Sequence, residues 1–230
     1  MTYCVSDLHG RYDLYMKLLK RLKLSEEDRL YILGDLVDRG PEGLKIVLDV
    51  AKRENVICLM GNHDLTAQFI LSKLLGGLTA GQLADLRELY GAWVYDGGDT
   101  TIAEFKALSL EDRRLAVMTL DSFRNYAEVK AGGNHFVLCH GGIDNYEPTK
   151  PLREYTIADL AFCREDYTKP KFSTEGVYLV TGHTPTAAIE GGEAGRIFYS
   201  HDHIAIDCGA VFGFGLGCLC LDTLQEIYVS

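Results

Sequence analysis

Residues 30–40 of the chain read Leu-Tyr-Ile-Leu-Gly-Asp-Leu-Val-Asp-Arg-Gly. The first four residues are apolar or aromatic and have high β-propensity, so they predict a buried strand over 30–33. The glycine, carboxylates and arginine that follow predict a loop, and Pro41 is well placed as the first residue of a helix. The stretch therefore reads as strand, polar loop and helix, with its reactive side chains in the loop.

The same arrangement occurs on both sides of this stretch. Upstream, the short apolar run Tyr3–Val5 leads into Asp7-Leu8-His9-Gly10 and a helix over 11–22. Downstream, Val56–Met60 leads into Gly61-Asn62-His63-Asp64 and a further helix. Three successive strand–loop–helix units predict parallel strands whose loops gather at one edge of a sheet.

The remainder of the chain has a different pattern. Between about 76 and 125, glycines interrupt helical stretches around 79–90, 100–107 and 110–124, which we interpret as a helical insertion. Later apolar runs predict further strands, the last four of them antiparallel: 126–130, 136–139, 177–180, 196–199, 204–206, 217–221 and 227–229. We expect residues 1–230 to form a single α/β domain with this insertion.

Composition narrows the classes of protein. A hydrophobic content of 47% in 230 residues is enough for a sizeable core. The net charge of −10, without a basic block, argues against nucleic acid or an anionic membrane as a partner. No apolar run approaches the roughly 20 residues of a membrane span, no leader segment is visible, and several of the seven cysteines lie in apolar runs. We expect a cytoplasmic protein, and the sequence does not predict its oligomeric state.

Five loop motifs carry candidate metal ligands. Three are those described above, and the other two are His140-Gly141-Gly142 and Gly182-His183-Thr184-Pro185, each after a predicted strand. Each motif alone could be a turn or a helix cap, but five in series indicate a shared site. Carboxylate, amide and imidazole groups together suit Mn²⁺, Fe or Zn²⁺ better than Ca²⁺. The candidate ligands are Asp7, His9, Asp35, Asn62, His140 and His183.

In this order the five motifs resemble the signature of the PPP-type metallophosphoesterases, and in particular of their bacterial and phage serine/threonine protein phosphatases. The resemblance extends from residue 3 to about residue 221, and includes Trp93 with Gly97-Gly98 and the segment Ile206–Phe212. It implies a four-layer α-β-β-α sandwich of mixed β-sheets, the calcineurin-like metallophosphoesterase fold. It also implies two divalent metal ions at the loop edge, with Mn²⁺ expected and Fe or Zn²⁺ as alternatives.

The resemblance further implies a role for each site residue. Asp35 would bridge the two metals, and a metal-bridging hydroxide would attack phosphorus. His63 would protonate the leaving oxygen, with Asp38 holding its imidazole. The implied ligands are Asp7, His9 and Asp35 for one metal, and Asp35, Asn62, His140 and His183 for the other. The implied phosphate-binding residues are Arg39, Asn62 and Arg164, the last because Phe162-Cys163-Arg164 has the family's spacing of an aromatic residue and an arginine.

Three positions depart from the protein phosphatase pattern. Asp64 stands where these enzymes usually have Glu, and Gly-Asn-His-Asp-Leu also occurs in bacterial diadenosine tetraphosphatases. Phe162 replaces a frequent Trp and Cys208 a frequent Thr, and we expect both of these changes to affect packing only.

From this resemblance we expect a metal-dependent phosphomonoesterase, a serine/threonine protein phosphatase acting on a phosphoprotein or phosphopeptide. Val37-Asp38-Arg39 favours this activity because the tetraphosphatases tend to lose that aspartate. The alternative is a dinucleoside polyphosphate hydrolase on the same fold, which cleaves a phosphoanhydride. A non-catalytic metal-binding module is disfavoured because all ligands, His63 and both arginines are present, and the negative charge argues against a nuclease.

Overall fold

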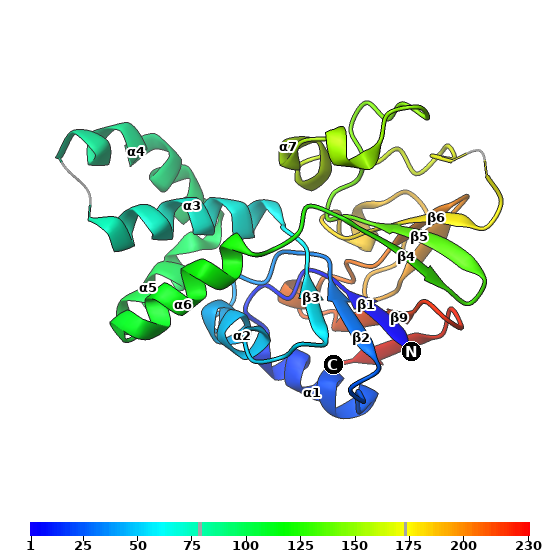
Figure 1. Ribbon diagram of the computed structural model, residues 1–230, viewed down its shortest axis with the longest axis horizontal. Helices are drawn as coiled ribbons and strands as arrows, with labels where there is room; N and C mark the ends of the chain where they lie inside the picture. Colours follow the sequence, from blue (N-terminus) through cyan, green and yellow to red (C-terminus); the bar gives the residue numbers. More distant parts are fainter. Residues whose placement is uncertain (78–79, 173) are drawn as a thin grey trace.

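The structure is a computed structural model that describes residues 1–77, 80–172 and 174–230. Two five-stranded sheets pack face to face, with helices outside them (Figure 1). The strands are β1 (Thr2–Val5), β2 (Arg29–Ile32), β3 (Val56–Cys58), β4 (Ala127–Ala131), β5 (Asn134–Leu138), β6 (Val177–Thr181), β7 (Phe198–Ser200), β8 (His203–Ala205), β9 (Leu216–Cys220) and β10 (Glu226–Val229). The helices are α1 (Tyr12–Leu22), α2 (Gly43–Val50), α3 (Asn62–Gly76), α4 (Ala80–Trp93), α5 (Asp99–Ala107), α6 (Leu110–Asp121) and α7 (Ile157–Ala161).

The first sheet has the strand order β10-β9-β1-β2-β3. Strands β1, β2 and β3 are parallel, as the three repeated units predict. Strand β1 lies in the middle of the sheet, because its other edge pairs antiparallel with β9 from near the end of the chain. The loops after β1, β2 and β3 therefore leave the sheet at the same edge.

The second sheet has the order β4-β5-β6-β8-β7 and is also mixed. The prediction that the closing strands are antiparallel is right for β7 against β8 and for β10 against β9. It does not extend to the other neighbour of β8, because β8 runs parallel to β6. A tight turn at His201-Asp202 joins β7 to β8. The chain therefore reverses direction in β7, and β8 then runs in the direction of β6.

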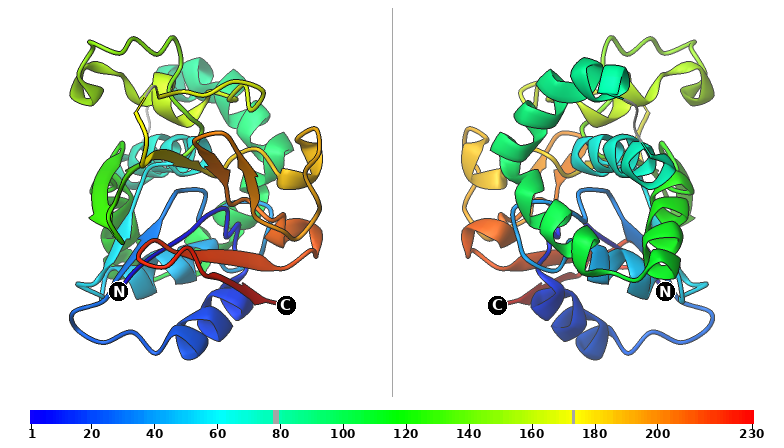
Figure 2. Two further views of the ribbon diagram at one scale, coloured as in Figure 1. Left: turned by 90° about the vertical axis from the view of Figure 1, so that its right-hand side faces the viewer. Right: turned by 90° about the vertical axis from the view of Figure 1, so that its left-hand side faces the viewer.

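Alternating side chains along the strands divide the apolar residues between layers. In β1, Cys4 packs between the two sheets, whereas Val5 faces the helices that cover the first sheet. In β5, Phe136 packs between the sheets and Val137 faces α7 on the other side. The layers are therefore helix, sheet, sheet and helix, the expected calcineurin-like fold class, and Figure 2 shows α1 beneath the first sheet.

Helices α3 to α6 gather at one side of the molecule, with α6 beside β3 (Figure 1). The helical stretches expected around 79–90, 100–107 and 110–124 correspond to α4, α5 and α6, with positions 78 and 79 outside the described residues. A π-helical turn, Val94–Gly98, joins α4 to α5 and brings this group against the loop after β2. Within the described residues every helix is too short or too polar to cross a bilayer.

Candidate metal centre

The loops that follow five strands meet at one edge of the two sheets. They carry the residues singled out in the sequence: Asp7 and His9 after β1, Asp35, Asp38 and Arg39 after β2, Asn62 and His63 after β3, His140 after β5, and His183 after β6. Six of them have a left-handed backbone, namely Asp7, His9, Asp35, Asp38, Arg39 and His183. This conformation is costly for residues other than glycine, and its concentration in one place is typical of functional sites.

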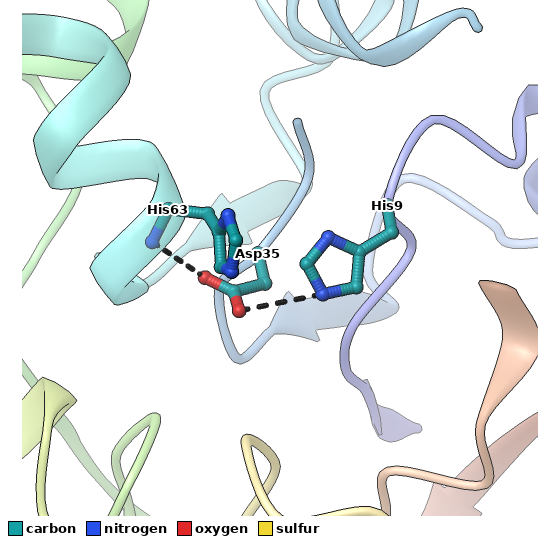
Figure 3. Close-up of side chains that lie close together, drawn as sticks. All are labelled: His9, Asp35 and His63. Carbon is teal, nitrogen blue, oxygen red and sulfur yellow. Dashed lines mark hydrogen bonds and ion pairs between the residues drawn. The ribbon is translucent and has the colours of Figure 1, made fainter. Parts of the chain in front are cut away.

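Asp35 lies at the middle of this edge. Its Oδ2 is 3.5 Å from His9 Nε2 and 3.3 Å from His140 Nε2, and its Oδ1 accepts the backbone N–H of His63 at 3.1 Å. Figure 3 shows His9 and His63 on either side of the carboxylate. Gly61 makes this packing possible, because a Cβ at that position would collide with the Asp35 carboxylate. One carboxylate oxygen is therefore shared between two groups of potential ligands.

His9 and Asp7 form the first side of the centre. The Nδ1 of His9 lies 2.9 Å from the Val37 carbonyl oxygen and donates to it, which leaves the Nε2 lone pair facing Asp35. Asp7 Oδ1 is 4.0 Å from the same Nε2. Asp7 Oδ2 accepts hydrogen bonds from Ser6 Oγ at 2.5 Å and from the backbone N–H of His183 at 2.9 Å. Asp7 therefore connects the loop after β1 to the loop after β6.

His140, His183 and Asn62 form the second side. The Nδ1 of His140 lies 2.6 Å from the Leu33 carbonyl oxygen, and its Nε2 is 3.1 Å from Asn62 Oδ1. The His140 and His183 rings meet edge to face with centroids 5.0 Å apart. Burial, reinforced by His140, lowers the pKa of His183 to about 3, so its imidazole is neutral and has a lone pair for a metal.

Among the residues that the structure describes, two sets of side chains have ligand atoms close enough to hold an ion. His9, Asp35 and His63 form one set and Asp35, His140 and His183 the other, with the ligand atoms of each set within 4.8 Å of one another. Buried imidazole nitrogens and a shared carboxylate are a donor set that fits divalent transition metals. Burial alone would raise the pKa of Asp35, but the nearby histidines outweigh it and hold that pKa below its usual range.

His63 is a member of the first set by distance. However, its Nδ1, on the side of the ring that faces away from the centre, is bound by another side chain. Its Nδ1 lies 2.8 Å from Asp38 Oδ2. Asp38 is completely buried and also accepts Trp93 Nε1–H and the Thr101 hydroxyl, each at 2.6 Å. Burial would lower the pKa of His63, but Asp38 and Asp35 outweigh it and raise that pKa. His63 Nε2 is therefore the nitrogen presented to the centre.

Two arginines lie against different sides of the centre. The guanidinium of Arg39 is 3.0 Å from His9 Nε2, 2.9 Å from His63 Nε2 and 3.1 Å from Asp96 Oδ1. The backbone N–H of Arg39 also donates to the Gly97 carbonyl at 2.9 Å, which ties it to the π-helical turn. Arg164 is exposed, and its Nη1 donates to Thr184 Oγ1 at 3.1 Å, next to His183.

Asp64 has a role that the sequence analysis did not assign. Its buried carboxylate accepts the backbone N–H groups of Asp35 at 2.7 Å, Leu36 at 2.9 Å, Val37 at 3.4 Å and Gly61 at 3.2 Å. Burial, with the Asp35 charge, raises the pKa of Asp64 to about 7. Asp64 thus fixes the loop that presents Asp35. Its place in the first turn of α3, where carboxylates bind backbone N–H groups, is a sequence signal for this role.

Trp93, Asp96, Thr101 and Thr184 also contact site residues and were given no role from sequence. Trp93 belongs to the family resemblance and Thr184 to the fifth motif, whereas Asp96 and Thr101 have no local signal. Of the two departures expected to affect packing only, Cys208 is buried between the sheets. Phe162 is 50% exposed, so packing does not account for it.

Comparison with known proteins places the chain in a family. Residues 2–205 match the family described as calcineurin-like phosphoesterase. The chain is 33% identical over 280 aligned residues to "Bis(5'-nucleosyl)-tetraphosphatase, symmetrical" of Pseudomonas syringae pv. syringae (strain B728a), covering 98% of this chain and 90% of that protein. A protein of the same name from Delftia acidovorans (strain DSM 14801 / SPH-1) is 46% identical over 65 residues, which are 27% of this chain and 23% of the relative.

Solved structures agree on the fold. A putative diadenosine tetraphosphatase superposes with a TM-score of 0.67 at 17% identity, covering 99% of this chain and 92% of the other. A protein serine/threonine phosphatase from Saccharomyces cerevisiae gives a TM-score of 0.55 at 12% identity, covering 90% of this chain and 66% of the other. At these identities the likeness concerns the fold alone.

The prediction of a serine/threonine protein phosphatase with a phosphoprotein substrate is wrong, because the relative that is similar over nearly the whole chain is named a tetraphosphatase. The five motifs supply the candidate ligands for the metals and the groups expected around the reacting phosphate, so they do not distinguish what that phosphate is attached to. Asp38 was used to choose between the two activities, but its carboxylate binds His63, Trp93 and Thr101 and is fully buried. The chain belongs to the calcineurin-like phosphoesterase family and is a metal-binding phosphoester hydrolase of that family.

Proposed function

We propose that this protein hydrolyses dinucleoside tetraphosphates, of which diadenosine tetraphosphate is the representative, and that it cuts the bridge symmetrically. Water adds to one of the two inner phosphorus atoms, the bond from that phosphorus to the central bridging oxygen breaks, and two nucleoside diphosphates leave. The observation that carries the proposal is the 33% identity to the symmetrical tetraphosphatase over 98% of this chain. The similarity also covers 90% of that relative, so it is not confined to one motif.

The metal-binding residues in this proposal are Asp7, His9 and Asp35 for one ion, and Asp35, Asn62, His140 and His183 for the other. Support comes from the position of Asp35 Oδ2 between His9 and His140 and from the neutral imidazole of His183. The nitrogen and oxygen donors fit Mn²⁺, Fe and Zn²⁺, and we expect Mn²⁺. When bound, two such ions supply positive charge to the phosphate oxygens and lower the pKa of the attacking water.

The other residues in the proposal bind the phosphates or move a proton. Arg39 and Arg164 each offer a planar pair of N–H donors to phosphate oxygens, and Asn62 contributes the N–H donors of its side-chain amide. Positive charge at this place offsets the repulsion between a polyphosphate and a chain of net charge −10. His63 delivers a proton to the leaving oxygen from Nε2, while Asp38 holds the opposite side of the ring.

The test compares substrates on one preparation. The purified protein, supplied with Mn²⁺, is assayed on diadenosine tetraphosphate, on a panel of phosphoserine and phosphothreonine peptides, and on 4-nitrophenyl phosphate, with products separated by anion-exchange chromatography. We expect ADP as the only nucleotide product and a kcat/KM at least tenfold above that for every phosphopeptide. Equimolar AMP and ATP would contradict the symmetrical cut, and a preference for a phosphopeptide would contradict the proposed function.

A further inference from the structure

We propose that a cavity beside the metal centre binds one nucleoside of the substrate. The cavity, here called the Thr184 cavity, has a volume of about 380 Å³, within the roughly 300–1,000 Å³ range of small-molecule sites. This inference rests on the proposed function, because it concerns the part of a dinucleotide that lies beyond the phosphates. The lining residues are Glu165, Asp166, Tyr167, Thr168, Thr184, Ala188, Ile189, Glu190, Phe198 and Ser200.

The cavity begins where the proposed phosphate site ends. Thr184 follows His183 in the chain and lines the cavity, and its Oγ1 accepts a hydrogen bond from Arg164 Nη1 at 3.1 Å. Glu165, directly after Arg164, lines another part of the wall. A diphosphate held between the metals and Arg164 would therefore place its nucleoside at the mouth of this cavity.

The walls offer aromatic faces to a nucleobase. The Tyr167 and Phe198 rings lie edge to face, with centroids 6.1 Å apart and planes at 84°, and Ile189 is buried against them. The Tyr167 hydroxyl is 3.2 Å from Thr181 Oγ1, which holds the ring in place. Rigid aromatic surface of this kind binds bases by stacking, with a contribution of about 1–3 kcal/mol per base.

The charged residues of the lining favour a neutral ligand group, such as a nucleoside, over a phosphate. Three lining residues are acidic and, within the described part of the chain, none is lysine or arginine. Lys171 pairs with Glu165 at 2.6 Å and Lys169 with Asp166 at 3.0 Å, whereas Glu190 is exposed at the wall. With Glu165 and Asp166 paired to lysines, Glu190 is the exposed lining carboxylate to which ribose hydroxyls and exocyclic amines can donate hydrogen bonds, and the described lining residues include no arginine or lysine to attract a phosphate. A nucleoside fits both requirements, and the polyphosphate stays with the arginines and metals.

The 3₁₀ turn Thr186–Ala188 provides a matched pair of variants. Ala187 and Ala188 are both exposed, but only Ala188 lines the cavity. Ala188→Trp places an indole in the cavity, and Ala187→Trp adds the same group on the same turn outside it. We expect the ratio of KM for diadenosine tetraphosphate to KM for 4-nitrophenyl phosphate to rise at least tenfold in Ala188→Trp and to stay within twofold in Ala187→Trp. Equal ratios in the two variants would overturn the nucleoside site.

A binding experiment separates this inference from the proposed function. ADP and inorganic pyrophosphate are titrated calorimetrically into the Mn²⁺-loaded wild type and both variants. We expect the wild type to bind ADP more tightly than pyrophosphate, and this preference to fall at least tenfold in Ala188→Trp alone. If wild type prefers phosphopeptides as substrates but shows this pattern with ADP, the proposed function fails and the nucleoside site stands. If diadenosine tetraphosphate is the preferred substrate but Ala188→Trp keeps the ADP preference, only the nucleoside site fails.

Discussion

Asp38 holds the imidazole of His63 in a buried pair, with Asp38 Oδ2 2.8 Å from His63 Nδ1 and the two side chains 0% and 3% exposed. The contact fixes the tautomer, because Nδ1 must donate to the carboxylate. Trp93 and Thr101 fill the remaining positions around Asp38, so the ring cannot turn without breaking several buried hydrogen bonds. His63 is therefore oriented before any substrate arrives.

The His63→Asn variant tests this residue as a proton donor. The proton matters most when the leaving oxygen is basic, so kcat on phenyl phosphate should fall by roughly 10²–10⁴-fold. The loss should be much smaller on 4-nitrophenyl phosphate, and also on diadenosine tetraphosphate, whose leaving group is a phosphate of pKa about 6. Equal losses on all three substrates, or loss of a metal ion by elemental analysis, would show that His63 has another role.

Thr101→Val tests the support of Asp38 from α5. The Thr101 hydroxyl donates to Asp38 Oδ1 at 2.6 Å and accepts the Asp38 backbone N–H at 3.0 Å, so valine leaves two buried groups without partners. We expect the free energy of unfolding to fall by about 1–3 kcal/mol, and kcat on phenyl phosphate to fall by roughly tenfold. Urea unfolding and steady-state kinetics measure these effects. Trp93→Phe should change both quantities in the same direction, and an unchanged kcat in both variants would contradict the positioning role.

Chelation should abolish hydrolysis and added Mn²⁺ should restore it, because the proposed mechanism needs two divalent ions. Asp35→Asn should reduce metal content at both sites, since Asp35 Oδ2 lies near His9 and His140 alike. Asn62→Ala should affect one site only, and elemental analysis after dialysis would show the difference. Full activity in metal-free protein would refute the dinuclear centre, and equal metal loss in the two variants would refute the bridge.

Arg39→Ala and Arg164→Ala should each raise KM and lower kcat on diadenosine tetraphosphate, because the contacts strengthen as charge develops on the phosphate. Lysine at either position should rescue only in part, since an ammonium cannot bind two oxygens in a planar fork. The Arg39→Ala variant keeps the backbone N–H that donates to the Gly97 carbonyl. We therefore expect the π-helical turn to keep its position against the loop after β2. Complete rescue by lysine would show that charge alone matters.

Asp64→Ala should lower the free energy of unfolding by at least about 3 kcal/mol, because several buried N–H groups lose their acceptor together. The affected donors include those of Asp35, Leu36 and Gly61. Metal affinity should fall as well, since the loop that presents Asp35 loosens. Urea unfolding gives the stability, and Glu88→Ala on the exposed face of α4 is the control, expected within about 0.5 kcal/mol of wild type. A loss no larger than this control would contradict the role of Asp64.

The sequence predicts most of the strands and also predicts that the loops after them lie at one edge of a sheet. Each motif follows a short apolar run and contains glycine, so position along the chain already gives position at the sheet edge. The Thr184 cavity has no such signal. Tyr167 lies in a loop after α7 and Phe198 in the edge strand β7, and only the strand order β6-β8-β7 brings them together. Trp93 and Thr101 reach Asp38 from helices that carry no motif, so their contacts depend on packing between distant segments.

The central position of β1 has a consequence for synthesis of the protein. Strand β1 is translated before β9, yet one edge of β1 pairs with β9, and Leu216 follows Val5 by 211 residues. At about 5–20 residues per second the growing chain leaves that edge unpaired for roughly 10–40 s. Asp7 likewise waits for the backbone N–H of His183, 176 residues later. Ribosome-bound chains that stop before residue 183 therefore present an open strand edge and an incomplete set of ligands to the chaperones around them.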